Sequence, residues 1–289
     1  MNHHTLDDSN RLLWKKLQET LKKISLDGHF ALAYSGGVDS RFVAHAGQKM
    51  GFTPLLLHVR GPHIPRAESD YAQRWAASRN LPLRELAVSP LNLPAVAAGT
   101  RERCYDCKYA LFSRLREVAD GLPLCDGTHA SDAQSYRPGR RALQELNINS
   151  PLALAGLSKP DIRRLGRLTG LEDSDQSARP CLLTRLDYGL RPSPELLSMI
   201  SNGEQAVADA LRAVFGKRSP DFRLRLTSPE RWELHLRLPE GTRELPPALE
   251  QDLARALLDA AHVRVNRIAV LETLSGYFDR KSCSTEVQP

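Results

Sequence analysis

The chain has 289 residues and a formal net charge of +6, and its hydrophobic and charged fractions, 41% and 26%, are those of an ordinary globular protein. No apolar run approaches the roughly 20 residues that span a bilayer, and the first residues lack the anatomy of a signal peptide, so we expect a cytoplasmic protein without membrane contacts. The positive charge comes from scattered arginines without interleaved aromatic residues, so we do not expect nucleic-acid binding.

The first part of the chain alternates predicted helices and strands. Leucines recur at helical spacing in the first helix, which we place at 9–27. The elements expected after it are strands 29–34, 54–59, 83–87 and 122–125, and helices 39–50, 66–79, 101–120 and 160–170. Strands that alternate with helices indicate an α/β fold with a parallel, doubly wound sheet. Ligands of such sheets bind at the carboxyl ends of the strands.

A change of composition around 185–195, with Gly189, Pro192 and Pro194, predicts a junction. The elements expected after it are helix 194–215, strands 222–226 and 232–236, helix 246–261 and strand 267–271. We therefore predict two domains, a nucleotide-binding domain at 1–188 and a smaller α+β domain at 189–289. The second domain is expected to serve substrate binding or oligomerisation, and we expect a homo-oligomer.

The loop that follows strand 29–34 has the composition of a phosphate-binding loop. It consists of Ser35, Gly36, Gly37, Val38, Asp39 and Ser40. The two glycines permit a sharp turn, after which successive N–H groups face a pyrophosphate at the positive end of a helix. The serines add hydroxyl donors, and Asp39 is the candidate ligand for the Mg²⁺ that accompanies ATP. An ordinary glycine-rich turn is the alternative interpretation.

Five cysteines, an odd number in a presumed reducing compartment, argue against structural disulfides and for metal-binding or reactive roles. They are Cys104, Cys107, Cys125, Cys181 and Cys283. The Cys104-x-x-Cys107 pair is compatible with a redox pair, half of a zinc site or part of an iron–sulfur site. Three cysteines suit a [4Fe–4S] cluster with one open iron, and packing as small buried hydrophobes is the alternative. Cys125 lies in an apolar strand, where we expect it to pack.

Further motifs follow the loop in a fixed order. They are Arg-Cys-Tyr-Asp-Cys-Lys at 103–108, Asp-Gly-Thr-His at 126–129, Tyr-Arg-Pro-Gly at 136–139, Ser-Pro-Leu at 150–152, Lys-Pro-Asp-Ile-Arg at 159–163 and Pro-Cys-Leu-Leu-Thr-Arg-Leu-Asp-Tyr-Gly at 180–189. The loop lacks the closing Gly-Lys-Ser/Thr of the Walker A motif. It resembles the PP-loop of enzymes that split ATP into AMP and pyrophosphate. Over about two-thirds of its length, the chain resembles the LarE-type ATP-dependent sulfur transferases of the PP-loop superfamily.

The resemblance implies adenylation of a carboxylate on a nicotinate-derived mononucleotide, followed by replacement of AMP with sulfur. This chemistry helps to build the nickel-pincer nucleotide cofactor. It implies ATP and Mg²⁺, a small carboxylated nucleotide as substrate, and sulfide or a cysteine-derived sulfur source. It assigns Asp126 and Gly127 to ATP binding and Cys181 to sulfur delivery. In three-cysteine members, the positions of Cys104, Cys107 and Cys181 hold a [4Fe–4S] cluster.

Arginines near these motifs suit anionic groups. Arg179 and Arg185 flank Cys181, and we favour a role of Arg185 in stabilising a thiolate or the developing oxyanion. Arg223 and Arg225 alternate on one predicted strand, so both point to the same face. Paired guanidiniums on one face suit a phosphate, and the family uses such a strand for its substrate phosphate. A solvent-facing charged strand is the alternative.

Several positions depart from the usual family pattern, and they place the identity of the acceptor in doubt. They are Arg41 and Phe42 after the loop, His129 and Ser131 after the Asp-Gly pair, the Asp-Gln-Ser at 175–177, and the segment 270–282. A tRNA thiolase of the same superfamily is the second hypothesis. An ammonia-dependent amide ligase would leave the three cysteines idle, and a nucleotide-binding protein without catalytic activity is the remaining alternative.

Overall fold

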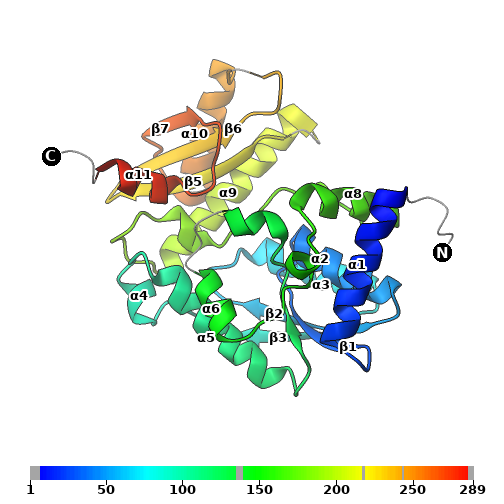
Figure 1. Ribbon diagram of the computed structural model, residues 1–289. Helices are drawn as coiled ribbons and strands as arrows, with labels where there is room; N and C mark the ends of the chain where they lie inside the picture. The colour runs from blue at the N-terminus through cyan, green and yellow to red at the C-terminus, as the bar shows by residue number, and fades with distance from the viewer. Residues whose placement is uncertain (1–6, 135–138, 217–218, 243, 286–289) are drawn as a thin grey trace. The chain divides into compact units, whose positions relative to one another are not determined.

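The structure of the chain is a computed structural model that describes residues 7–134, 139–216, 219–242 and 244–285 (Figure 1). Residues 136–138 of one motif and the side chain of Cys283 lie outside this description. The chain forms two compact units, one of Met1–Pro90 with Glu102–Arg179 and one of Leu91–Arg101 with Pro180–Pro289. The sequence prediction places the division after residue 188, and the longer segment of the second unit begins at Pro180.

The first unit is built on a parallel sheet, as the alternation of strands and helices predicts. Its strands are β1 (His29–Ala33), β2 (Thr53–Arg60), β3 (Leu83–Ala87) and β4 (Leu124–Cys125). Their order is β3-β2-β1-β4, and all neighbouring strands are parallel. Because β1 and β4 are neighbours, the loops that leave their carboxyl ends lie at the same edge of the sheet.

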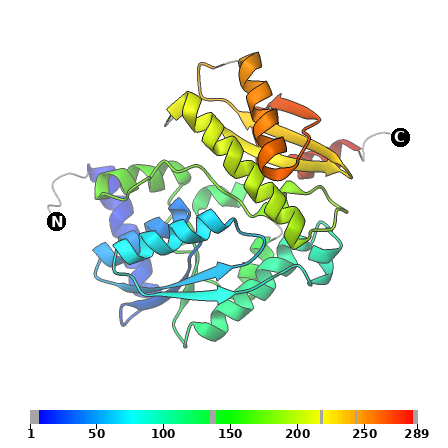
Figure 2. The ribbon, with the colours of Figure 1, turned by 180° about the vertical axis from the view of Figure 1, so that it is seen from behind.

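Helices cover both faces of this sheet. They are α1 (Asp8–Ile24), α2 (Val38–Lys49), α3 (Arg66–Ser78), α5 (Arg103–Val118), α6 (Gly139–Glu145), α7 (Pro151–Leu154) and α8 (Lys159–Thr169), with the 3-10 helix η2 at Ala130–Gln134. Phe30 and Leu32 of β1 pack in one core with α1, α2, α3 and α8. Ala31, which points to the opposite face, packs in a second core with Leu115 of α5. Figure 2 shows α3 in cyan and α5 in teal on either side of the strands.

The second unit contains a three-stranded sheet and its own core. Its elements are α4 (Pro94–Ala97), the 3-10 helix η3 (Leu182–Arg185), α9 (Pro194–Phe215), β5 (Asp221–Ser228), β6 (Arg231–Arg237), α10 (Pro247–Ala261), β7 (Arg267–Val270) and α11 (Tyr277–Thr285). β5 pairs with β6 antiparallel, and β6 pairs with β7 parallel. The small α+β unit predicted for the C-terminal region is therefore present.

The two faces of the small sheet differ in chemistry. Leu224, Leu234 and Leu236 point to one face and pack against α9 and α10. Arg225 alternates with Leu224, and on the opposite face it meets aromatic residues at the start of α11, a helix that the sequence did not predict. The small sheet thus has an apolar face that packs against α9 and α10, and a polar face on which α11 contacts Arg225.

Within the described residues, no helix is both long and apolar enough to cross a membrane.

A buried histidine in the first unit makes folding stability depend on pH. His45 is 1% exposed, and its Nε2 lies 3.1 Å from the Thr169 hydroxyl. Burial lowers the pKa of His45 from 6.5 to about 4, so between these values the unfolded chain binds a proton that the folded chain does not. We expect a fall from about pH 7 to about pH 5 to lower the free energy of unfolding by about 2 kcal/mol more in wild type than in His45→Gln. Urea unfolding at both pH values measures this difference, and equal pH dependence in both proteins would contradict it.

Candidate functional site

The predicted phosphate-binding loop joins the end of β1 to the start of α2. Gly36 has φ +78°, in the left-handed region that favours glycine. A Cβ at this position would lie 2.7 Å from the Cβ of Ala72 on α3, so the loop can approach α3 only because residue 36 has no side chain. Gly37 is extended and caps α2. The chain therefore turns sharply and enters the helix directly.

Serine hydroxyls hold the loop in shape. The Ser35 N–H donates to the Ser40 Oγ at 3.3 Å, and the two hydroxyl oxygens are 3.2 Å apart. The Gly37 N–H donates to the Ser35 Oγ at 3.2 Å, and the Ser40 hydroxyl donates to the Gly37 carbonyl at 3.1 Å. The same groups stand at the positive end of α2, where backbone N–H groups and the helix dipole favour an anion. The geometry suits a bound phosphate group.

Asp39, the candidate magnesium ligand, forms an ion pair with Lys159. The Lys159 ammonium lies 2.6 and 2.7 Å from the two carboxylate oxygens, and both side chains are partly exposed. Lys159 is the first residue of α8, and its N–H donates to the Ser131 hydroxyl at 3.2 Å. Lys159 begins the motif at 159–163, and its contact with Asp39 was not predicted from the sequence. The only sequence feature that pointed to a role for this residue is a lysine at the start of a predicted helix within that motif.

Asp126 and Gly127 lie directly after β4 and close to the same loop. Asp126 is 5% exposed, and it accepts hydrogen bonds from the Thr128 N–H at 3.1 Å and the Ser150 hydroxyl at 2.7 Å. A Cβ on Gly127 would lie 3.0 Å from the Ser40 backbone nitrogen. The Asp126 carboxylate therefore holds the backbone turn that follows β4. Gly127, the next residue, packs against the start of α2.

The first cysteine pair lies at the start of α5, with Cys104 in its first turn and Cys107 one turn later. Cys104 is exposed and Cys107 is 8% exposed. Residues three positions apart on a helix share one face, and the positive helix end favours thiolates. Cys125 is fully buried in the core of the first unit, as predicted, and burial raises its pKa. Within the described part of each unit, no group of three or more His, Cys, Asp or Glu side chains is placed to hold a metal ion.

Cys181 belongs to the second unit and directly precedes η3. It is half-buried. Its carbonyl accepts hydrogen bonds from the Thr184 N–H at 3.0 Å and the Thr184 hydroxyl at 2.7 Å. Arg185, for which we predicted a catalytic role, is 3% exposed and pairs with both carboxylate oxygens of Glu204 at 2.6 and 2.9 Å. It also donates to the Pro180 carbonyl at 3.3 Å. Arg185 therefore ties the segment around Cys181 to α9.

Arg223 and Arg225 lie on β5 of the second unit. Arg225 is 3% exposed, donates to the His235 Nδ1 and the Leu274 carbonyl, and lies 4.6 Å above the Tyr277 ring. Burial, followed by the charge of Arg185, lowers the pKa of both arginines to about 10. They remain protonated at neutral pH, and with Arg185 they give the second unit a concentration of positive charge.

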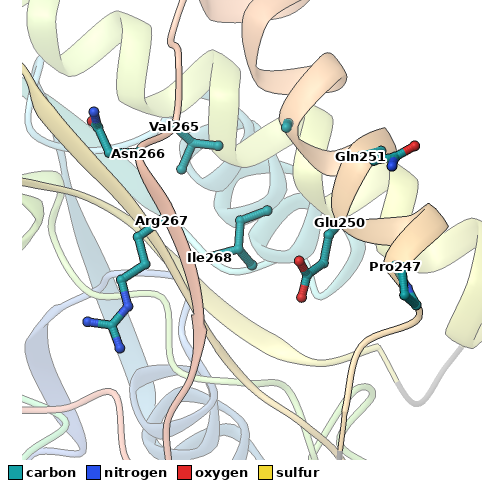
Figure 3. Close-up of a pocket in the computed structure, with 8 residues that line it drawn as sticks. Pro247, Glu250, Gln251, Val265, Asn266, Arg267 and Ile268 are labelled. Atoms are coloured by element: carbon teal, nitrogen blue, oxygen red, sulfur yellow. The ribbon is translucent and has the colours of Figure 1, made fainter.

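The second unit also contains a shallow cavity between α10 and β7 (Figure 3). Glu250 of α10 and Arg267 and Ile268 of β7 are among the residues that line it. None of the predicted site residues contributes to this cavity. The predicted groups are therefore distributed as follows: the ATP-binding residues and the first two cysteines lie in the first unit, and Cys181, Arg185, Arg223 and Arg225 lie in the second.

Comparisons with known proteins give distant similarities. No protein-family model matches the chain. The chain is 33% identical over 177 residues to an uncharacterized protein of Synechocystis sp., covering 60% of this chain and 66% of the relative. It is 29% identical over 208 residues to an uncharacterized protein of Methanocaldococcus jannaschii, covering 70% and 79%. It is 25% identical over 179 residues to pyridinium-3,5-bisthiocarboxylic acid mononucleotide synthase of Lactiplantibacillus plantarum, covering 60% and 65%. The alignments thus span just under two thirds of the length of the first and third relatives.

Proposed function

We propose that this chain is an ATP-dependent sulfur transferase of the LarE type that converts a carboxylate of a nicotinate-derived mononucleotide into a thiocarboxylate. The observation that carries the proposal is the loop from Ser35 to Ser40 at the start of α2, with the Asp39–Lys159 pair beside it. The similarity to pyridinium-3,5-bisthiocarboxylic acid mononucleotide synthase supports the sulfur chemistry and the nucleotide substrate. The proposed product serves the nickel-pincer nucleotide cofactor.

In the first proposed half-reaction, a carboxylate oxygen of the substrate attacks the α-phosphorus of ATP. The bond between that phosphorus and the bridging oxygen breaks, and pyrophosphate leaves while an acyl adenylate forms. The loop N–H groups and the hydroxyls of Ser35 and Ser40 would hold the pyrophosphate. Asp39 would hold its Mg²⁺, and the Lys159 ammonium would neutralise phosphate charge. This step turns a carboxylate oxygen, a poor leaving group, into part of a good one.

In the second proposed half-reaction, a sulfur nucleophile attacks the carbonyl carbon of the acyl adenylate. The bond from that carbon to the AMP oxygen breaks, AMP leaves, and any proton on the sulfur passes to solvent. Cys181 is the proposed sulfur carrier, because a thiolate is a strong nucleophile near neutral pH. If the Cys181 thiolate attacks, a thioester forms, and loss of a proton from its Cα with breakage of the Cβ–Sγ bond releases the thiocarboxylate and leaves dehydroalanine; if added hydrosulfide attacks, its own sulfur becomes that of the thiocarboxylate. Free sulfide or a cysteine-derived donor is the proposed source of the sulfur.

Cys104, Cys107 and Cys181 are the proposed ligands of a [4Fe–4S] cluster. Cys104 and Cys107 fit thiolate ligands, because they lie one turn apart at the positive end of α5 and Cys104 is exposed. When bound, such a cluster would supply an open iron position for added sulfide. This chain's residues would provide the thiolates. The hydrogen bonds from Thr184 to the Cys181 carbonyl would hold Cys181 in place.

The second unit is the proposed site of the substrate phosphate. Arg185, Arg223 and Arg225 are buried or partly buried, and the charge of Arg185 acts on the other two. Glu204 balances one of these charges, and the remaining excess favours an anion. The two terminal nitrogens of Arg225 already donate to His235 and Leu274. We therefore propose that Arg225 adds to the positive potential of the site without contacting the phosphate directly.

Anaerobically purified protein tests the proposal. We expect Mg-ATP and the pyridinium dicarboxylate mononucleotide to give pyrophosphate, AMP and a thiocarboxylate, detected by mass spectrometry. We also expect a broad absorption band at about 400 nm, which Cys104→Ala removes. Pyrophosphate release that requires a tRNA transcript, or that requires ammonium and yields an amide, would contradict the proposal. A colourless, iron-free protein with full activity would contradict the cluster alone.

A further inference from the structure

Arg41, the first residue after the phosphate-binding loop, is one of the largest fully buried side chains of the first unit. It is 0% exposed, although it carries a permanent charge and lies on the first turns of α2. Its Nε donates to the Gly36 carbonyl at 3.0 Å. Its terminal nitrogens donate to the carbonyls of Glu172 and Asp173 at 2.7 and 3.1 Å, and to the Gln176 side chain at 2.7 Å. The guanidinium therefore links the loop to the segment that follows α8.

The bond to Gly36 fixes the orientation of a peptide group in the loop. The described chain contains no cis peptide bonds, so the Gly36 carbonyl and the Gly37 N–H point in opposite directions across one plane. Because Arg41 holds the carbonyl on the buried side, the Gly37 N–H points away from Arg41, and in the structure it reaches the Ser35 hydroxyl at 3.2 Å. Glycine at 36 has no side chain to resist rotation, so an external contact is needed to hold this plane.

Aromatic rings on α3 fix the other faces of Arg41. Its guanidinium carbon lies 5.3 Å from the centre of the Tyr71 ring and 5.8 Å from that of Trp75. The Tyr71 hydroxyl donates to Asp173 at 3.2 Å, and the Trp75 N–H donates to Glu172 at 3.3 Å. The two rings and the segment at 172–176 thus surround the Arg41 guanidinium. Lysine has a single ammonium and cannot reproduce its four hydrogen bonds.

We propose that Arg41 is a positioning residue for the pyrophosphate group of ATP: it holds the Gly36–Gly37 peptide so that the Gly37 N–H, which donates to the Ser35 hydroxyl in this structure, lies on the side of the loop where the anion binds. The proposal rests on the proposed use of ATP and adds to it a residue that never touches the nucleotide.

Binding of magnesium pyrophosphate and of AMP, measured separately by calorimetry, tests this role. Arg41→Lys and Arg41→Met are expected to bind pyrophosphate about tenfold or more weakly, as for loss of one charged hydrogen bond, and AMP within about twofold of wild type. Arg79→Gln is the matched control, because Arg79 contacts the same Trp75 ring and Glu172 but bonds to Gly170 instead of the loop. It is expected to lower the melting temperature without changing the ratio of the two affinities.

Three results are decisive. Selective loss of pyrophosphate binding in the Arg41 variants supports the positioning role. Equal losses for pyrophosphate and AMP, or wild-type affinity for both, would overturn it and leave ATP use intact. Failure of the wild-type protein to bind magnesium pyrophosphate and Mg-ATP would overturn the proposed ATP use itself. If Arg41→Met does not fold, Arg41→Lys, which keeps the charge and most of the volume, still carries the comparison.

Discussion

Asp39→Asn is expected to slow pyrophosphate release by about a thousandfold while ATP binding changes by less than about tenfold. The reason lies in the charge balance of the Asp39–Lys159 pair, in which one carboxylate meets one ammonium at 2.6 and 2.7 Å. Asparagine is nearly the same size as aspartate but carries no charge, so it is a poor ligand for Mg²⁺ and leaves the Lys159 charge unbalanced. That charge still attracts ATP. The loss should therefore appear in kcat, with little change in KM for ATP.

Lys159→Met should have the opposite signature. It removes the ammonium and leaves Asp39 free to take Mg²⁺, so the apparent affinity for Mg²⁺ should rise while KM for ATP increases by about tenfold or more. Lys49→Met, at the other end of α2, is a control of the same chemistry at a distance from the loop. Steady-state pyrophosphate release at varied Mg²⁺ and ATP measures both effects. Unchanged Mg²⁺ dependence in Asp39→Asn would rule out the proposed role of Asp39.

Most of the fold follows from hydrophobic periodicity. Strand 83–87 and helix 194–215 have the predicted bounds, and the strands predicted at 222–226 and 232–236 are each extended by a few residues. The first helix ends earlier than predicted, at Ile24, because Ser25 is extended and its hydroxyl donates to the His29 carbonyl at 2.7 Å. Periodicity detects a repeated apolar face, whereas this stop depends on one local hydrogen bond.

The site was less predictable, because its charged residues are placed by contacts between distant segments. The glycines and serines of the loop form hydrogen bonds with residues only a few positions away, so the sequence pattern alone predicts the loop. Arg41 reaches Glu172 and Gln176, and Lys159 reaches Asp39, across more than a hundred residues. An arginine after a glycine-rich loop has no local signature of burial. Only the fold shows that its charge is satisfied by carbonyl oxygens.

The two strand arginines illustrate the same limit in the second unit. Alternation correctly predicts that Arg223 and Arg225 avoid the face of Leu224, which packs in the core. It does not predict that α11 covers Arg225, because the residues of 270–282 give no periodic signal. The Tyr277 ring packs against one face of the Arg225 guanidinium, and the Leu274 carbonyl accepts a hydrogen bond from it. A charged strand was thus predicted, and its burial was not.

Cys181→Ala is expected to separate the two half-reactions. Its carbonyl is held by the N–H and hydroxyl of Thr184, and these backbone contacts survive removal of the thiol. Adenylation is proposed to use the ATP-binding groups of the first unit and the substrate-phosphate site of the second unit, and neither set includes the Cys181 thiol. Pyrophosphate release in a single turnover should therefore remain within about threefold of wild type. Thiocarboxylate formation should fall by at least about a thousandfold, because the variant lacks the proposed nucleophile or cluster ligand. Rapid-quench measurement of pyrophosphate and mass spectrometry of the product follow the two steps separately.

Cys125→Ala is the matched control, since it removes the same thiol from a fully buried position on β4. It should lower the free energy of unfolding by about 1–2 kcal/mol through loss of packing, with both half-reactions preserved. If Cys181→Ala instead loses pyrophosphate release as strongly as product formation, Cys181 acts before or during adenylation. Sulfur delivery would then have to be assigned to another group. The assignment of Cys181 therefore depends on a difference between two rates in one protein, which a general loss of folding cannot produce.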